Sequence, residues 1–183
     1  LDKYPLMIYA GAGAKNIIAL TEAALKGAGK DLQGVKGVIG ADPIGELVVN
    51  GKTSTSLSAL FDEMAETIKY TRAHAPLICP VYVRSDCFTD GGANAVQEVA
   101  YTFATAVEYI REMQKRGIAV KDVAASLYFA FNQGANFFME IAKLRALRQV
   151  WAAIMEAFGA EEVAALWAAN RWLKEMSKCC ISL

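Results

Sequence analysis

The chain has 183 residues, of which 55% are hydrophobic, and its 19 basic residues equal its 19 acidic ones. This length suits one domain with a sizeable core, and the zero net charge argues against a nucleic-acid-binding surface or a polybasic membrane surface. Because no apolar run reaches the roughly 18 residues of a membrane span and no signal peptide is evident, we expect neither nucleic acid nor a membrane as partner.

The first part of the chain predicts two strands and one long helix. Residues 6–10 form a short apolar run typical of a strand, and residues 14–25 show helical spacing up to the glycines that follow. Residues 35–39 predict a second strand, and a turn is expected at residues 40–43. A small excursion is expected over residues 47–51, with a turn at its end.

The middle of the chain predicts helix, strand and helix in succession. Ser56 is a good N-cap for a helix over residues 57–74. Residues 77–83 predict a third strand, in which Pro80 fits poorly because proline cannot donate a ladder hydrogen bond. A long helix is expected over residues 94–115.

The last part predicts a fourth strand over residues 126–131 and a helix over residues 136–158, which Gly159 ends. Residues 161–176 are typical of a final helix. These two helices are unusually rich in tryptophan and methionine, which suits a buried contact with a further part of the fold or an oligomer interface. The residues concerned are Trp151, Met155, Trp167, Trp172 and Met176.

Strands that alternate with long helices predict right-handed βαβ crossovers and a parallel sheet. We expect one domain over residues 1–176 and a tail over residues 177–183. Four βα units are half of the eight in a complete barrel, so the predicted fold is α/β, about half of a (β/α)8 TIM-type barrel, with a small open sheet as the alternative. Exposed sheet edges pair readily with another chain, so we expect a dimer or a larger assembly.

Two glycine-containing segments invite a phosphate-binding interpretation. Gly11-Ala12-Gly13 lies between a strand and a helix, but Asn16 stands where the dinucleotide fingerprint requires its third glycine. Gly51-Lys52-Thr53 is similar to the end of a P-loop, but Glu46 occupies the place of the required first glycine. We interpret both segments as structural turns.

Arg84, Ser85, Asp86 and Cys87 follow the third strand, at the end where barrels carry their active sites. Asp86 could serve as a general base and Cys87 as a nucleophile. A nucleophilic cysteine needs a nearby histidine or cation, and His74 is expected at the far end of the preceding helix. A loop carboxylate and an inert thiol are therefore the favoured interpretation.

On the helix over residues 136–158, Glu140 and Lys143 are spaced for an ordinary surface ion pair. The same helix has an apolar stripe that we expect to pack in the core. The stripe consists of Phe137, Phe138, Ile141, Leu144 and Leu147.

The cysteines give no metal pattern. They form no C-x-x-C pair, and one histidine cannot complete a common zinc site. Reduced thiols are expected, and the match of the last four residues to a prenylation box is interpreted as fortuitous. The cysteines are Cys79, Cys87, Cys179 and Cys180.

Two segments, GANAVQE at residues 92–98 and NFFMEIAKLR at residues 136–145, are similar to the cobalamin-dependent methylmalonyl-CoA mutase family. Weaker support comes from residues 40–43 and 171–172, and the resemblance extends from about residue 9 to residue 172. It implies a (β/α)8 barrel whose lumen is threaded by an acyl-CoA, and a radical rearrangement with adenosylcobalamin as cofactor. In that family the cofactor lies on a separate domain, which supplies a histidine from an Asp-x-His-x-x-Gly motif. A cytoplasmic or mitochondrial-matrix location is also implied.

The chain departs from this family where the catalytic residues are expected. The family's catalytic Tyr-His pair aligns with Asp86 and Cys87, its glutamine with Gly40, and its carboxylate-binding arginine falls near Asn50. Together with Arg84, these are the candidate substrate-channel positions, and none of them carries a catalytic residue of the family. The cobalamin-binding motif is absent from the sequence, so this chain alone is expected to bind no cofactor and no metal.

The resemblance therefore favours a non-catalytic barrel segment, similar to the small subunit that some members of the family pair with a catalytic chain. A second hypothesis is an acyl-CoA mutase of altered substrate choice, which needs a cobalamin domain from elsewhere. A third is a free-standing half-barrel that associates with itself.

Overall fold

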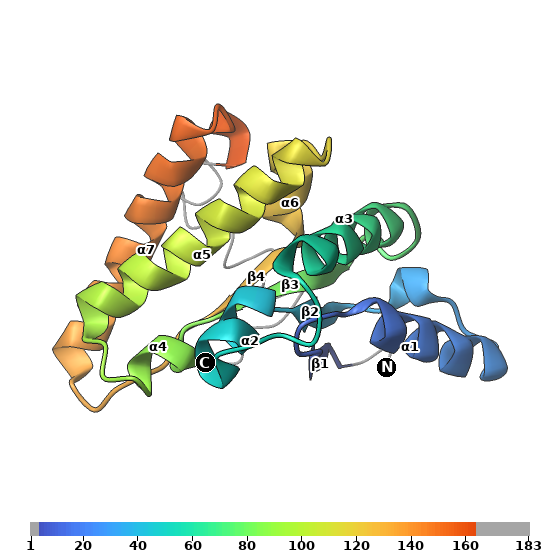
Figure 1. The fold of residues 1–183 in the computed structure, drawn as a ribbon, viewed down its shortest axis with the longest axis horizontal. Helices are drawn as coiled ribbons and strands as arrows, with labels where there is room; N and C mark the ends of the chain where they lie inside the picture. The colour runs from blue at the N-terminus through green and yellow to red at the C-terminus, as the bar shows by residue number, and fades with distance from the viewer. Residues whose placement is uncertain (1–3, 164–183) are drawn as a thin grey trace.

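The computed structural model describes residues 4–163, which form a parallel four-stranded sheet covered by long helices (Figure 1). The strands lie side by side in chain order, β1-β2-β3-β4. All three pairings are parallel, which confirms the α/β fold with consecutive βα units that the sequence predicts. The strands are β1 Leu6–Tyr9, β2 Gly37–Ala41, β3 Ile78–Arg84 and β4 Leu127–Ala130.

The four long helices lie close to the predicted ranges. In α3, α5 and α7 the residue before the helix caps the N-terminus with a side chain that accepts hydrogen bonds from free backbone N–H groups. Ser56 accepts from Ala59, and Asn94 forms a capping box with Gln97. The helices are α1 Lys15–Gly27, α3 Leu57–His74, α5 Ala95–Lys115 and α7 Phe137–Ala157.

The structure contains short helices that the sequence patterns did not predict. Residues 43–50 form α2 (Pro43–Asn50), so the predicted turn at residues 40–43 and the excursion at residues 47–51 are wrong. Asp42 caps this helix, Pro43 starts it, and Gly51 ends it in the left-handed conformation at φ 67°. The remaining short elements are η1 Leu32–Gly34, α4 Asp86–Thr89 and α6 Val120–Ser126.

Two apolar clusters join the helices to one face of the sheet. The larger one contains Val81 and Val83 of β3 together with buried residues of α3, α5 and α7. In Figure 1, α3, α5 and α7 lie together on this side of β3 and β4. The smaller cluster joins Ile39 of β2 to Ile18 and Leu25 of α1. Helices on one face of a sequentially ordered parallel sheet are the arrangement of a partial barrel.

The packing of α7 corrects the predicted stripe. Leu147 is buried, but Phe137, Phe138 and Ile141 are 69%, 81% and 41% exposed. The core is instead reached by Trp151, which is fully buried and whose ring stacks on Phe103 at 5.4 Å between centroids. Trp151 thus packs within the chain's own core.

Pro80 lies within β3, at an irregularity of the sheet. Between Val38 and Ala41 of β2 the register shifts against β3, whose matching partners are Cys79 and Val81. Strand β2 thus has two residues, Ile39 and Gly40, opposite the single Pro80 of β3, as in a β-bulge. A proline is tolerated there because the ladder is already interrupted.

Several predictions fall outside residues 4–163 and stay predictions. These are most of the helix expected over residues 161–176, the domain boundary at residue 176, Trp167, Trp172 and the two cysteines of the tail.

Candidate functional site

The candidate site lies where the parallel strands end at their carboxyl termini. Arg84 is the last residue of β3, and Asp86 and Cys87 start α4 directly after it. Gly40 lies near the end of β2 and Asn50 at the end of α2. The fold therefore brings the predicted positions to the same edge of the sheet, where barrel folds carry their sites.

Arg84 is held by an acidic and an aromatic neighbour. Its Nε and Nη2 atoms donate to the two carboxylate oxygens of Asp86 at 2.6 and 2.5 Å, a bidentate pair. Its guanidinium carbon also lies 4.9 Å from the centre of the Tyr9 ring. The hydrogen bonds from Arg84 to Asp86 raise the pKa of the guanidinium despite the opposing effect of burial, so the side chain is permanently charged.

Glu46 of α2 completes this cluster. It accepts a hydrogen bond from the Tyr9 hydroxyl at 2.6 Å and one from Asn50 at 2.8 Å, and it lies 3.8 Å from Arg84. Burial and the hydrogen bond to Glu46 raise the pKa of Tyr9, so its hydroxyl stays protonated at neutral pH. Asn50 thus joins the candidate site through Glu46. The sequence patterns did not identify Glu46 as a site residue.

Asp42 is fully buried behind this cluster. It accepts hydrogen bonds from the Tyr109 hydroxyl at 2.5 Å and from the backbone N–H groups of Gly45 at 2.9 Å and Arg84 at 3.2 Å. Burial raises the pKa of this carboxyl, although the three donors act in the opposite direction. Asp42 therefore joins β2, the end of β3 and α5.

Gly40 permits a close approach between β2 and β3. A Cβ atom at this position would lie 2.6 Å from the Cβ and 2.8 Å from the backbone nitrogen of Tyr82. The Tyr82 ring packs against Tyr9 of β1 at 5.5 Å and against Tyr128 of β4 at 5.4 Å. In this packing, position 40 has no room for a side chain.

Cys87 has the properties of an inert thiol. It is half-buried, and its sulfur donates weakly to the carbonyl of Arg84 at 3.5 Å. Burial, followed by the negative charges of Asp42 and Asp86, raises its pKa to about 11. A nucleophilic cysteine requires the opposite shift.

Glu140 and Lys143 form the predicted ion pair, but the prediction that it lies on the surface is wrong, because Lys143 is buried. Its side chain is 2% exposed and its Nζ lies 2.7 Å from Glu140 and 2.8 Å from Glu98, which is 3% exposed. Burial lowers the pKa of Lys143, but the two carboxylates outweigh that effect and raise it, so the amine stays protonated. Glu98 lies 45 residues away in sequence, so helical spacing within α7 could not reveal this partner.

The two glycine-containing segments are structural. At the start of α1, the backbone N–H of Lys15 points to Glu63 at 3.4 Å, so the chain itself supplies an anion to this helix terminus. A Cβ at Gly13 would lie 2.5 Å from that carboxylate. Gly51 is the C-cap of α2, with no helix directly after it to bind phosphate.

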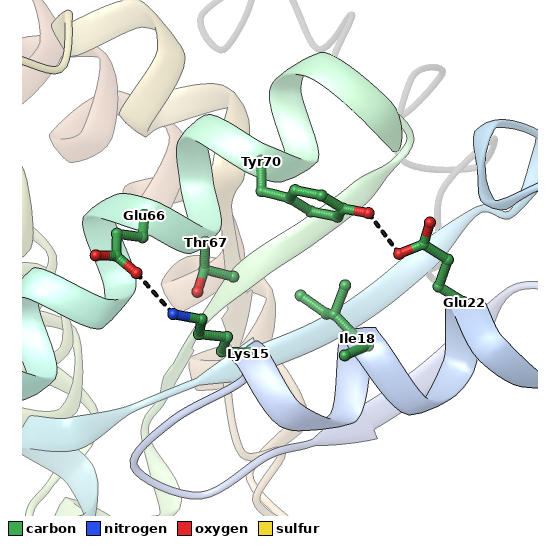
Figure 2. Close-up of a pocket in the computed structure, with 7 residues that line it drawn as sticks. Lys15, Ile18, Glu22, Glu66, Thr67 and Tyr70 are labelled. Atoms are coloured by element: carbon green, nitrogen blue, oxygen red, sulfur yellow. Dashed lines mark hydrogen bonds and ion pairs between the residues drawn. The ribbon is translucent and has the colours of Figure 1, made fainter.

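A cavity of about 320 Å³ lies between α1 and α3 (Figure 2). Buried Ile18 and Thr67 line its centre, and the polar side chains at its rim are paired with each other. Lys15 donates to Glu66 at 2.8 Å, and the Tyr70 hydroxyl donates to Glu22. The polar side chains at the rim of this cavity are therefore bound to one another and need no ligand to satisfy them.

Within residues 4–163, no histidine lies at the strand ends to offer a cobalt ligand. The single histidine, His74, is exposed at the end of α3 and stacks on Tyr70. The length of β3, roughly 20 Å, separates it from Cys87 and from the group of Tyr9, Glu46, Arg84 and Asp86, here called the strand-end cluster. Within residues 4–163 no group of three histidine, cysteine or acidic side chains is arranged to hold a metal ion.

Among the helices that the structure describes, none combines the length and the apolar character needed to cross a membrane.

Comparison with known proteins gives the following matches. The family described as Methylmalonyl-CoA mutase matches residues 1–171. The methylmalonyl-CoA mutase small subunit of Streptomyces virginiae is 36% identical over 87% of this chain and 25% of its own length. The large subunit from Propionibacterium freudenreichii subsp. shermanii is 31% identical over 87% of this chain and 22% of its own. A methylmalonyl-CoA mutase of Cereibacter sphaeroides is 42% identical over 56% of this chain and 14% of its own. The chain thus spans a quarter or less of these relatives.

Proposed function

This chain belongs to the methylmalonyl-CoA mutase family, and from that premise we propose that it is a non-catalytic barrel segment that pairs with a catalytic chain of the family. Relatives that carry the names small subunit and large subunit support a division of roles between chains. The observation that carries the proposal is the strand-end cluster, whose charged groups are bound to one another.

The charges of this cluster disfavour a carboxylated substrate. Asp86 and Glu46 surround Arg84, so two acidic groups face one basic group. A substrate carboxylate placed there would have to displace Asp86 from a bidentate contact, and it would meet Glu46 as a like charge. Cys87, with its raised pKa, offers little thiolate for covalent chemistry.

An apolar surface on α7 offers a place for the partner. Phe137, Phe138, Met139 and Ile141, here called the α7 apolar surface, are between 41% and 81% exposed. Aromatic residues and methionine are enriched at protein interfaces. The start of α7 follows the end of β4, so this surface adjoins the edge at which the candidate site lies.

The test is co-purification of the tagged chain with a large subunit of the family at micromolar concentration. A one-to-one complex is expected, and Phe138→Glu is expected to weaken it at least about tenfold, since a charge would enter the apolar contact. Leu20→Glu is the matched control, because Leu20 is also exposed, at 70%, but lies on α1, which packs in the smaller apolar cluster.

Absence of a complex with the unmodified chain would refute the pairing. Isomerase activity of the chain when it is mixed with a cobalamin-binding domain alone would instead support an altered-substrate mutase. A stable homodimer that excludes the large subunit would favour self-association.

A further inference from the structure

The carboxylate of Glu98 lies directly behind the candidate site and contacts two loops at once. Its Oε1 atom accepts hydrogen bonds from the Ser85 hydroxyl at 2.6 Å and from the backbone N–H of Asn132 at 3.0 Å. Its Oε2 atom accepts from Lys143 at 2.8 Å. The carbonyl oxygen of Asn132 also accepts from Lys143, at 2.6 Å. One buried ion pair therefore joins α5, α7 and the chain segments that follow β3 and β4.

We propose that Glu98 and Lys143 are positioning residues, which hold the turn after β3 so that Asp86 stays beside Arg84. This role concerns the geometry of the strand ends and does not depend on whether the chain pairs with a catalytic subunit.

Ser85 is the residue through which the ion pair acts on this turn. Its backbone N–H donates to Ala130 at 2.9 Å, which extends the pairing of β3 and β4 by one residue. Its carbonyl accepts from Phe88 and Thr89 and so starts α4. Because Ser85 is fully buried and its hydroxyl is bound to Glu98, the direction in which α4 leaves the sheet is fixed, and with it the place of Asp86.

Asn132 provides a second connection from the same carboxylate. While its N–H is bound to Glu98, its side-chain amide donates to the Thr89 hydroxyl at 2.5 Å, at the end of α4. Both ends of α4 are thereby connected to the Glu98–Lys143 pair. Hydrogen bonds to an ionised carboxylate fix direction as well as distance, which apolar side chains of similar volume would not do.

The experiment measures how fast the Cys87 thiol reacts with an aromatic disulfide reagent in the folded protein, relative to Cys79 in the same molecule. All variants carry Cys179→Ser and Cys180→Ser. Ser85→Ala removes the connection to the turn and leaves the Glu98–Lys143 pair in place, whereas Lys143→Met breaks the pair. Each is expected to raise the ratio of the Cys87 rate to the Cys79 rate about tenfold, because the turn opens locally.

Arg116→Met is the control for a purely stabilising role. Arg116 makes ion pairs with Asp62 and Glu112 at the other end of α5, so its loss should lower the stability and leave the ratio of rates unchanged. An unchanged ratio in Ser85→Ala overturns the proposal, even if Lys143→Met fails to fold.

Discussion

Lys143 and Glu98 form a buried ion pair at 2.8 Å between α7 and α5, with side chains that are only 2% and 3% exposed. Charged groups are rarely found at such depth unless they are paired and hydrogen-bonded. Here the ammonium also donates to the carbonyl of Asn132, and the carboxylate accepts two further hydrogen bonds. Satisfied in this way, the pair belongs to the core and not to the surface.

Breaking this pair from one side should be strongly destabilising. We expect Lys143→Met to lower the free energy of unfolding by about 3–5 kcal/mol, because Glu98 would remain buried without its partner. Urea denaturation measures this change. Lys26→Met is the control, since the Lys26–Glu22 pair has a 71% exposed lysine and solvent screens such exposed pairs, so its loss should change the stability little. A loss below about 1 kcal/mol in Lys143→Met would contradict the burial of the pair.

Gly40→Ala should destabilise the sheet. The added methyl group would approach the backbone of Tyr82 at 2.8 Å, and neighbouring strands cannot separate without losing hydrogen bonds. We expect a loss of about 2 kcal/mol or more, measured by thermal or urea unfolding. Gly34→Ala is the matched control, because a Cβ at Gly34 meets nothing within 4 Å. Equal stability of the two variants would show that β2 and β3 are not packed this closely.

Cys87 should react slowly with thiol reagents until the pH is high. Its pKa is raised to about 11 by burial and by the nearby carboxylates, so its reaction rate should keep rising between pH 8 and pH 11 and then level off. The shift stabilises the folded state below the pKa of the unfolded thiol, and this contribution is lost as the pH rises through about 11. Labelling of the Cys79→Ser, Cys179→Ser, Cys180→Ser variant measures the profile. A rate that levels off near pH 8 would contradict the raised pKa.

Tyr109→Phe should remove the side-chain donor to the buried carboxyl of Asp42. The hydroxyl also accepts a hydrogen bond from the backbone N–H of Ile44 at 2.9 Å, so that group would be left without its partner as well. We expect a loss of about 1–3 kcal/mol in urea denaturation. Tyr101→Phe serves for comparison, because Tyr101 is 46% exposed, and it should change the stability by less than about 0.5 kcal/mol. Similar values for both variants would argue against the Asp42–Tyr109 contact.

The strand-end positions show how far a family resemblance reaches. It singled out Gly40, Asp86 and Cys87, while Arg84 was expected beside them because it follows the third strand, and in the structure all four lie at or just after the carboxyl ends of β2 and β3. It did not identify Tyr9 or Glu46, whose contacts with Arg84 arise from β1 and α2. Glu98 lies inside the segment of residues 92–98 that carries the resemblance, and this was the signal that could have drawn attention to it.

The sequence by itself determined the elements whose causes are local. Ser56 and Asn94 start α3 and α5 because their side chains bind backbone groups two or three residues away, and strands that alternate with long helices require parallel crossovers. Only the tertiary structure decided which residues are buried, because burial depends on partners far along the chain. Lys143 lies in the interior because Glu98 and Asn132 meet it there, while Phe137 and Phe138 stay exposed because no described element covers them. Spacing along α7 shows which residues share a helix face, but contacts from other elements decide whether that face is in the core.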